Sequence, residues 1–337
     1  MSVRVTAVHP SCAIEGGRIT IEGTGFPVDG PSVSDVQVGG ATARVVYASA
    51  TQISVIVPSG LDGGRAAIRV TGSSGEKAFV DLAAPIATGI HQVDSPIFDH
   101  DGNLYVTISG TRGQQVPVSI FRVRPNGTRE PFSSGIVNPT SMAVDAHGRL
   151  YVSSRFEGAV YRVMPDGTAE IFAHDLGVTC GLAFSREGFL FAGDRSGTVF
   201  KIAADGHATV FASLPASVAA FHLAFGGDDM LYVTGPTLSS YDELYRISPD
   251  GTVTTRYARF GRPQGLAVDR DGTVLVVEAL AGASGLYRLP PSGDPELVLS
   301  GPGLVGVAFD AMGNIVVASN ETAYRLSRSV QNRTLPT

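Results

Sequence analysis

Short runs of alternating apolar and polar residues, separated by turns rich in glycine and proline, follow one another along the whole chain. Alternation over four to eight residues is typical of a strand with one buried face. Runs with the i, i+3, i+4 apolar spacing of a helix are absent from the sequence. The 41 glycines and 20 prolines agree with this pattern, because many short strands require many turns. The sequence therefore predicts an all-β protein.

Two phrases recur with a period near 40 residues from residue 84 onward. The first reads Gly-Leu-Ala-Val-Asp-Arg-Asp-Gly at 265–272, and the six copies have their anchor positions at Asp99, Asp145, Ser185, Gly226, Asp269 and Asp310. The second is an aromatic residue followed by a basic one, as in Tyr161-Arg162, with turns such as Pro-Asp-Gly-Thr after it. Asn-Gly and Asp-Gly are strong hairpin signals. Each copy thus predicts four antiparallel strands, and radial repetition of such units predicts a six-bladed β-propeller over residues 84–327.

The last copy lacks a fourth strand. It ends near residue 327, and the C-terminal tail, 328–337, has no alternating run. Upstream of the first copy, Pro-Ile-Ala-Thr-Gly-Ile at 85–90 matches Pro-Phe-Ser-Ser-Gly-Ile at 131–136, which occupies the fourth-strand position of the first copy. We expect residues 85–90 to complete the sixth unit and so to close the ring.

Residues 1–83 do not share the repeat and predict a separate sandwich-like domain. Its alternating segments are Arg18–Glu22, Asp35–Val38, Ala43–Tyr47, Gln52–Val57, Ala66–Thr71 and Lys77–Leu82. Three motifs overlap or adjoin these segments: Glu-Gly-Gly-Arg-Ile-Thr-Ile-Glu-Gly-Thr-Gly-Phe at 15–26, Val-Gly-Gly at 38–40 and Ile-Ser-Val-Ile-Val-Pro at 53–58. With these motifs the segment resembles the TIG (IPT) immunoglobulin-like domain. The repeats of residues 84–327 resemble NHL-type propellers and the gluconolactonase-like hydrolases.

Charge and cysteine content exclude several classes of protein. The net charge is −6 and the basic residues form no cluster, which argues against nucleic-acid binding. No apolar run is long enough to span a bilayer. The first residues enter a strand pattern without an apolar signal core, so we expect a cytoplasmic protein, or an exported one if a signal was removed before this numbering. Cys12 and Cys180 fall in different predicted domains and imply no disulfide framework.

The repeat also predicts where a site would lie. The starts of the inner strands, the ends of the second strands and the loops after the second strands share one face of a propeller, and residues that break the repeat on this face are the candidates. The weak catalytic candidates are Asp94, His222 and Glu278. The ligand-binding candidates are Arg155, Arg195, Phe221, Tyr241, Gln264 and Asn320. For several of them a structural role is the alternative: Glu278 as a strand-end cap, His222 as a packed histidine and the arginines as surface groups.

Two functions remain open at this point. The gluconolactonase-like resemblance implies a divalent metal held by a glutamate early in the first blade and by an asparagine and an aspartate in later blades. Here Asp94 stands at the first position, and the later inner-strand starts provide no second carboxylate: Thr140, Cys180, Phe221, Gln264 and Val305. We therefore expect a non-catalytic binding or scaffold protein without a cofactor, with a protein partner and with a small molecule or carbohydrate as a further option. The alternative is a metal-dependent lactone or ester hydrolase with an altered site, in which a divalent ion such as calcium is bound.

Overall fold

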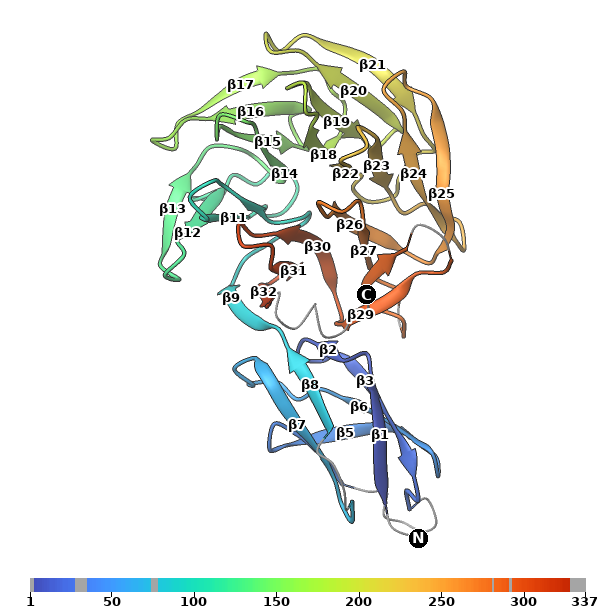
Figure 1. Cartoon of the computed structure of the whole chain (residues 1–337). Coiled ribbons are helices and arrows are strands. Elements are labelled where there is room, and N and C mark those ends of the chain that lie inside the picture. Colours follow the sequence, from blue (N-terminus) through green and yellow to red (C-terminus); the bar gives the residue numbers. More distant parts are fainter. Residues whose placement is uncertain (1–2, 28–34, 74–77, 281, 291–292, 328–337) are drawn as a thin grey trace.

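The computed structural model describes residues 3–27, 35–73, 78–280, 282–290 and 293–327. Strands β1 to β32 and no helices form these ranges, so the prediction of an all-β fold is confirmed (Figure 1). The described part of the chain accordingly has no helix that could cross a membrane. Lys77 and the tail at 328–337 lie outside the described residues.

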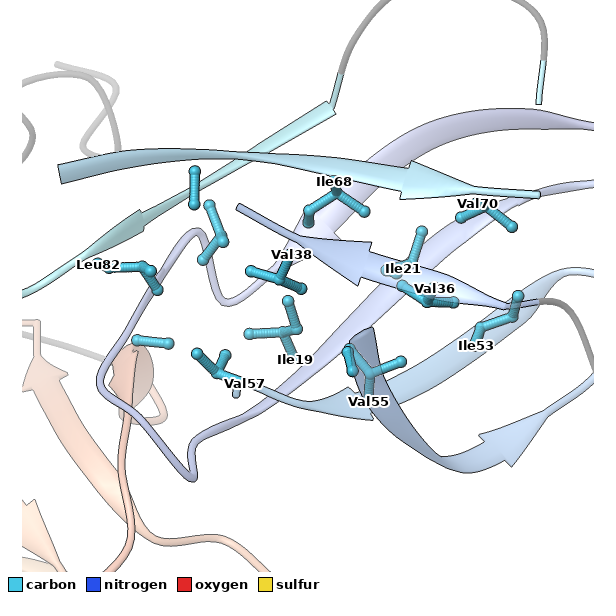
Figure 2. Packing of buried hydrophobic residues seen from close by; sticks show 14 of the residues in the cluster. Ile19, Ile21, Val36, Val38, Ile53, Val55, Val57, Ile68, Val70 and Leu82 are labelled. Carbon is cyan, nitrogen blue, oxygen red and sulfur yellow. The ribbon is translucent and has the colours of Figure 1, made fainter. Parts of the chain in front are cut away.

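The N-terminal domain is a sandwich of two packed sheets. One sheet consists of β1 (Arg4–His9), β3 (Arg18–Thr24), β6 (Gln52–Ile56) and β5 (Ala41–Ala48), and the other begins with β4 (Val36–Val38), β7 (Gly64–Val70) and β8 (Ala78–Leu82). Side chains alternate along β3, so Ile19 and Ile21 are buried between the sheets while Thr20 lies on the opposite face. Figure 2 shows the resulting apolar core.

The rest of the chain is a β-propeller of four-stranded antiparallel units (Figure 1). Five separate sheets are formed, by β10 (Ile97–Phe98), β11 (Leu104–Thr107), β12 (Ile120–Val123) and β13 (Arg129–Ser133); by β14 (Pro139–Val144), β15 (Leu150–Ser154), β16 (Ala159–Val163) and β17 (Ala169–Ala173); by β18 (Thr179–Phe184), β19 (Leu190–Asp194), β20 (Thr198–Ile202) and β21 (Ala208–Ser213); by β22 (His222–Phe225), β23 (Leu231–Thr234), β24 (Asp242–Ile247) and β25 (Val253–Phe260); and by β30 (Leu304–Phe309), β31 (Ile315–Ser319), β32 (Thr322–Leu326) and β9 (Ala84–Thr88). Edge-to-face aromatic pairs such as Tyr151 with Phe184 pack neighbouring sheets against each other.

The ring closes as the sequence predicts. Strand β9, which precedes the first repeat, pairs antiparallel with β32, and Ala87 stands opposite Ala323. The inner strands contact one another in the order β10, β14, β18, β22, β26, β30, and β30 contacts β10. The chain thus joins the end of the ring to its beginning through hydrogen bonds between strands more than 230 residues apart.

The number of separate blades is a correction to the prediction of six. In the described residues five four-stranded sheets stand alone, and the four strands β26 (Pro263–Val268), β27 (Val274–Glu278), β28 (Gly285–Leu289) and β29 (Glu296–Ser300) belong to a twelve-stranded sheet that continues into the sandwich. The connection is β2 (Cys12–Ala13), which pairs parallel with β29 on one side and with β8 on the other. Because β2 occupies the outer edge of β29, this unit is not a free blade.

Apolar packing reinforces the connection between the two domains. Cys12 and Ile14 are buried in one cluster with Leu299 and Leu304 of the propeller. The amide of Ile14 also donates a 3.0 Å hydrogen bond to the carbonyl of Ser300. Because backbone pairing and a shared core join the domains, we infer that their relative orientation is fixed.

Candidate functional site

The loops expected at the propeller mouth do meet on one face. Here the mouth means the face formed by the connections after the second strands and those that lead into the next inner strands. Backbone hydrogen bonds tie these connections together in pairs: the amide of Arg155 donates to Asn138 and that of Arg195 donates to Val178. The short turns between first and second strands lie at the other ends of the same strands, on the opposite face.

Two of the three catalytic candidates meet near the ring axis. Nδ1 of His222 lies 2.5 Å from Oδ1 of Asp94, although the two residues are 128 positions apart. Two inner strands separate β22 from β10 on either side of the ring, so this contact joins opposite sides of the propeller. The side chains are 1% and 6% exposed, which excludes bulk solvent from the pair. An ionised carboxylate only accepts hydrogen bonds, so Nδ1 is the donor.

Small residues around the axis leave the space that His222 occupies. A Cβ atom on Gly265 would lie 2.5 Å from the Cα of Gly306 and 2.8 Å from Oγ of Ser95. On β18, a Cβ on Gly181 would lie 2.6 Å from the carbonyl oxygen of Phe221. Larger side chains at these positions would collide with backbone of the neighbouring strands, whereas β22 carries the large side chain of His222. Its Nε2 is buried and has no hydrogen-bond partner among the described residues.

Cys180 lies in the same charged neighbourhood but is not an activated thiol. Burial raises the pKa of its thiol to about 12, and the carboxylate of Asp94 adds to the rise. The guanidinium groups of Arg195 and Arg155 lower the pKa of this thiol, but by less than burial raises it. At neutral pH the thiol therefore stays protonated, and a protonated thiol is a poor nucleophile. Burial likewise raises the pKa of Cys12 to about 11.

Glu278 does not join Asp94 and His222. Its carboxylate is buried and accepts hydrogen bonds from the backbone amides of Gly261 and Arg262, at 2.7 Å each, and of Leu280, at 2.8 Å. It therefore caps a strand end, which is the structural alternative that the sequence left open. Among the described residues no group of three or more His, Cys, Asp and Glu side chains could hold a metal ion. Of the three weak catalytic candidates, only Asp94 and His222 therefore meet, and a catalytic role for them stays a prediction.

Phe221 is also wrongly placed among the ligand-binding candidates. It is 1% exposed and packs in the core of the third and fourth units, where Gly193 and Gly235 make room for its side chain. A ligand at the mouth cannot stack on a ring that is covered on both sides by protein.

The remaining candidates are accessible but dispersed. Arg155 is half-buried and donates a long hydrogen bond to Ser109, whereas Arg195 is exposed and donates to the carbonyl of Val218. Gln264 is half-buried and Asn320 is exposed. Tyr241 is 62% exposed, on the loop of the fourth unit.

Two residues that sequence reasoning missed hold the long mouth loops in place. The buried Asn138 donates to the carbonyls of Ser109 and Thr111 and accepts from the amide of Gly113, so it fixes the loop of the first unit. The buried Asp242 accepts from both the amide and the hydroxyl of Thr237 in the fourth unit. Asn138 has a positive φ of 48°, a conformation that asparagine tolerates, but its partners lie too far along the chain to be read from the sequence.

Several connections at the mouth expose large apolar side chains. We call the following set the mouth rim: Phe156, Val178, Leu238, Tyr241 and Leu280. Leu238 is 93% exposed, and the others are between 37% and 62% exposed. All five stand on connections of the same face of the propeller, and Leu238 and Tyr241 share one loop.

Comparison with known proteins identifies the N-terminal domain. Residues 4–82 match the IPT/TIG domain family, which confirms the resemblance of that segment. A search of curated proteins found no match to the chain.

Several solved structures share the architecture at low sequence identity. An auxiliary nutrient binding protein from Bacteroides thetaiotaomicron VPI-5482 is 13% identical with a TM-score of 0.56, and the similarity covers 97% of this chain and 98% of that one. A gluconolactonase from Xanthomonas campestris is 19% identical with a TM-score of 0.60, over 72% of this chain and 88% of that one. The virginiamycin B lyase of Staphylococcus aureus is 12% identical with a TM-score of 0.53, over 72% and 97%. Binding proteins, a hydrolase and a lyase share this fold, so the fold alone does not decide the function.

Proposed function

We propose that the protein is a non-catalytic binding protein that engages a protein partner through the mouth of its propeller. The observation that carries the proposal is the mouth rim, whose exposed apolar side chains stand on connections bonded to buried carboxylates. Asp242 holds the loop of Leu238 and Tyr241, Glu278 accepts from the amide of Leu280, and Asp194 accepts from the amide of Val178. A loop that is already ordered loses little conformational entropy when it binds, so such a surface is suited to tight association.

The distribution of the mouth rim favours a macromolecular partner over a small molecule. Its side chains come from connections of the second, third, fourth and fifth units, whereas a small-molecule site encloses most of its ligand in one concave pocket. Tyrosine, phenylalanine and arginine are enriched at the centres of protein interfaces, and Arg155 and Arg195 lie beside these apolar groups. The partner that fits is a protein with an apolar patch and a carboxylate that these arginines can bind.

The architecture supports the same proposal. The auxiliary nutrient binding protein resembles this chain over its full length, sandwich and propeller together, while the gluconolactonase aligns with less of it. A sandwich held in fixed orientation to a propeller presents two surfaces at a constant distance, which is a useful property in a scaffold.

Exchange of two mouth-rim residues tests the proposal. In the double variant Leu238→Ser, Tyr241→Ser, we expect partner recovery from a cross-linked extract of the native host to fall at least tenfold, since central apolar contacts contribute most of the binding energy. The matched control is Ile171→Ser, Val210→Ser, because these side chains are 59% and 67% exposed on outer strands away from the mouth. The control should recover the partner within about twofold of the wild type. Equal recovery by the mouth variant would contradict the proposal.

The hydrolase alternative has one specific observation in its favour, the buried pair of Asp94 and His222 near the axis. Against it, the Asp94 carboxylate is already engaged by His222 and by the amide of Ser95. We expect no change in melting temperature with calcium, magnesium, manganese or zinc, and no hydrolysis of gluconolactone with any of them. A metal that binds only the folded state must raise the melting temperature, so a saturable rise together with turnover would support the hydrolase.

A further inference from the structure

A second hollow lies away from the mouth's centre, where the sandwich meets the propeller. Two cavities of about 510 and 500 Å³ adjoin one another there and share Arg18, Thr20 and Leu297 among their lining residues. The floor is the outer face of β3 and β6, and the opposite wall is β29 with the loop at 282–284. We call this hollow the junction groove. The hollow is open to solvent along its length, and domain interfaces are a preferred place for ligand sites.

The lining of the junction groove combines an exposed aromatic ring with uncharged polar groups. Tyr47 is 49% exposed at one side, next to Val46, which is 41% exposed. In the register of the sheet, Ser54 stands opposite Tyr47 on one strand and opposite Thr20 on the other, and the hydroxyls of Ser54 and Thr20 are 3.0 Å apart. Gln52 extends the polar row.

We propose that the junction groove binds a neutral oligosaccharide. A sugar ring presents an apolar C–H face, which stacks on an aromatic ring such as Tyr47, and a rim of hydroxyls, which exchange hydrogen bonds with amide, hydroxyl and carboxylate side chains. Both kinds of partner stand side by side along β3, β5 and β6. This site touches the mouth through the loop at 282–284 and excludes Leu238 and Tyr241, so it goes beyond the protein partner proposed above.

The charges of the groove favour an uncharged ligand. Arg18 and Glu22 lie on the same face of β3, with Thr20 between them on that face. In the described residues neither of them forms an ion pair. Their opposite charges cancel, and His9 and Tyr47 are the other titratable side chains that line the groove. Both charged side chains remain available to bind hydroxyl groups as donor and acceptor.

Backbone pairing argues against an extended peptide as the occupant. A peptide that binds by strand addition needs a free sheet edge. The floor on β3 and β6 has none, because β3 pairs with β1 and β6, and β6 pairs with β3 and β5. The sheet edge lies on β1, whose His9 borders the groove. Recognition on the floor therefore depends on side chains, which suits a polyhydroxylated ligand.

The groove is formed before any ligand arrives. The backbone amide of Arg18 donates a 2.8 Å hydrogen bond to the hydroxyl of Ser300 on β29, so the two walls are tied together at their base. The amide of Val57 donates to the carbonyl of Gly17 and holds the neighbouring turn against β6. A preformed groove avoids the ordering cost that a flexible one would incur.

Calorimetric titration of the full-length protein with a fixed panel of neutral hexasaccharides tests the proposal, using α- and β-linked glucans, a β-mannan and a β-xylan. We expect at least one to bind, with Tyr47→Ala weakening it at least tenfold and Tyr47→Phe staying within about threefold. The matched control is Tyr241→Ala at the mouth, which should bind like the wild type. Raising the salt from 50 to 500 mM should change the affinity less than twofold, because a neutral ligand gives no ion pair to screen.

Three results would overturn this inference: no binding of any hexasaccharide, equal affinity of wild type and Tyr47→Ala, or a Tyr47-dependent peptide in place of a sugar. The variant Tyr47→Ala removes an exposed side chain, so its melting temperature should equal that of the wild type. Because the mouth variants leave the groove intact, failure of this proposal and failure of the protein-partner proposal are separable.

Discussion

Replacing Asp94 by alanine should lower the free energy of unfolding by about 1–3 kcal/mol, the typical cost of leaving a buried hydrogen-bonding group without its partner. The variant leaves Nδ1 of His222 buried without its acceptor, and Nε2 already has no partner in the described residues. It also removes the contact that joins opposite sides of the ring. Urea unfolding measures this loss. It can be followed by the near-ultraviolet circular dichroism of the tyrosines, because the chain has no tryptophan for fluorescence.

A double-mutant cycle separates the pair from the cavities that truncation leaves. We expect Asp94→Ala and His222→Ala to cost less together than the sum of the two single changes, because either one already abolishes the contact. Cys180→Ala is the control, since Cys180 is equally buried and its thiol bonds to the backbone of Val178 and Phe221 rather than to another side chain. Strict additivity at positions 94 and 222 would show that the pair contributes no coupling.

Replacing Gly17 by valine should uncouple the two domains. A Cβ at this position would lie 2.4 Å from the carbonyl oxygen of Ser300 and 2.9 Å from that of Ile14, so the backbone must move. Forced insertions of this kind cost about 1–3 kcal/mol. Here the displaced atoms include the acceptor of the hydrogen bond from Ile14, next to β2. Scanning calorimetry should therefore resolve separate transitions for sandwich and propeller in the variant and one transition in the wild type.

The matched control for this change is Gly227→Val. A Cβ on Gly227 has no atom within 4 Å, and the residue lies in an exposed turn of the fourth unit. Its free energy of unfolding should stay within about 0.5 kcal/mol of the wild type. A single transition in Gly17→Val at the wild-type temperature would mean that the contact at Ser300 does not couple the domains.

The repeated parts of the fold were predictable from the sequence, and the connection between the domains was not. The aromatic-basic phrase recurs in every unit, an Asn-Gly or Asp-Gly turn follows it in four of them, and even the closing strand β9 carries a copy of the outer-strand pattern. Strand β2 has two residues, too few for any alternation to be visible. Its pairing with β29 is also parallel and spans almost the whole chain, and it converts a predicted free blade into part of a larger sheet.

The sequence predicted which face of the propeller carries the candidate residues, but not which of these residues contact one another. Asp94 and His222 both break the repeat, but the sequence gives no sign that residues from opposite sides of the ring touch. Glu278 and Phe221 occupy mouth positions in the repeat. Only the structure shows that backbone amides donate hydrogen bonds to the Glu278 carboxylate and that protein atoms cover the Phe221 ring. Asn138 and Asp242 were missed because their roles depend on loop partners rather than on a motif.

The fixed orientation of sandwich and propeller is the claim on which the scaffold proposal depends, and a spin-label distance distribution tests it most directly. Labels at Thr42→Cys in the sandwich and Val210→Cys on β21 can be attached selectively, because Cys12 and Cys180 are buried and the pKa values of their thiols are raised. We expect one narrow distance distribution in the otherwise wild-type protein and a broadened one when Gly17→Val is added. A broad or multimodal distribution without Gly17→Val would contradict the account.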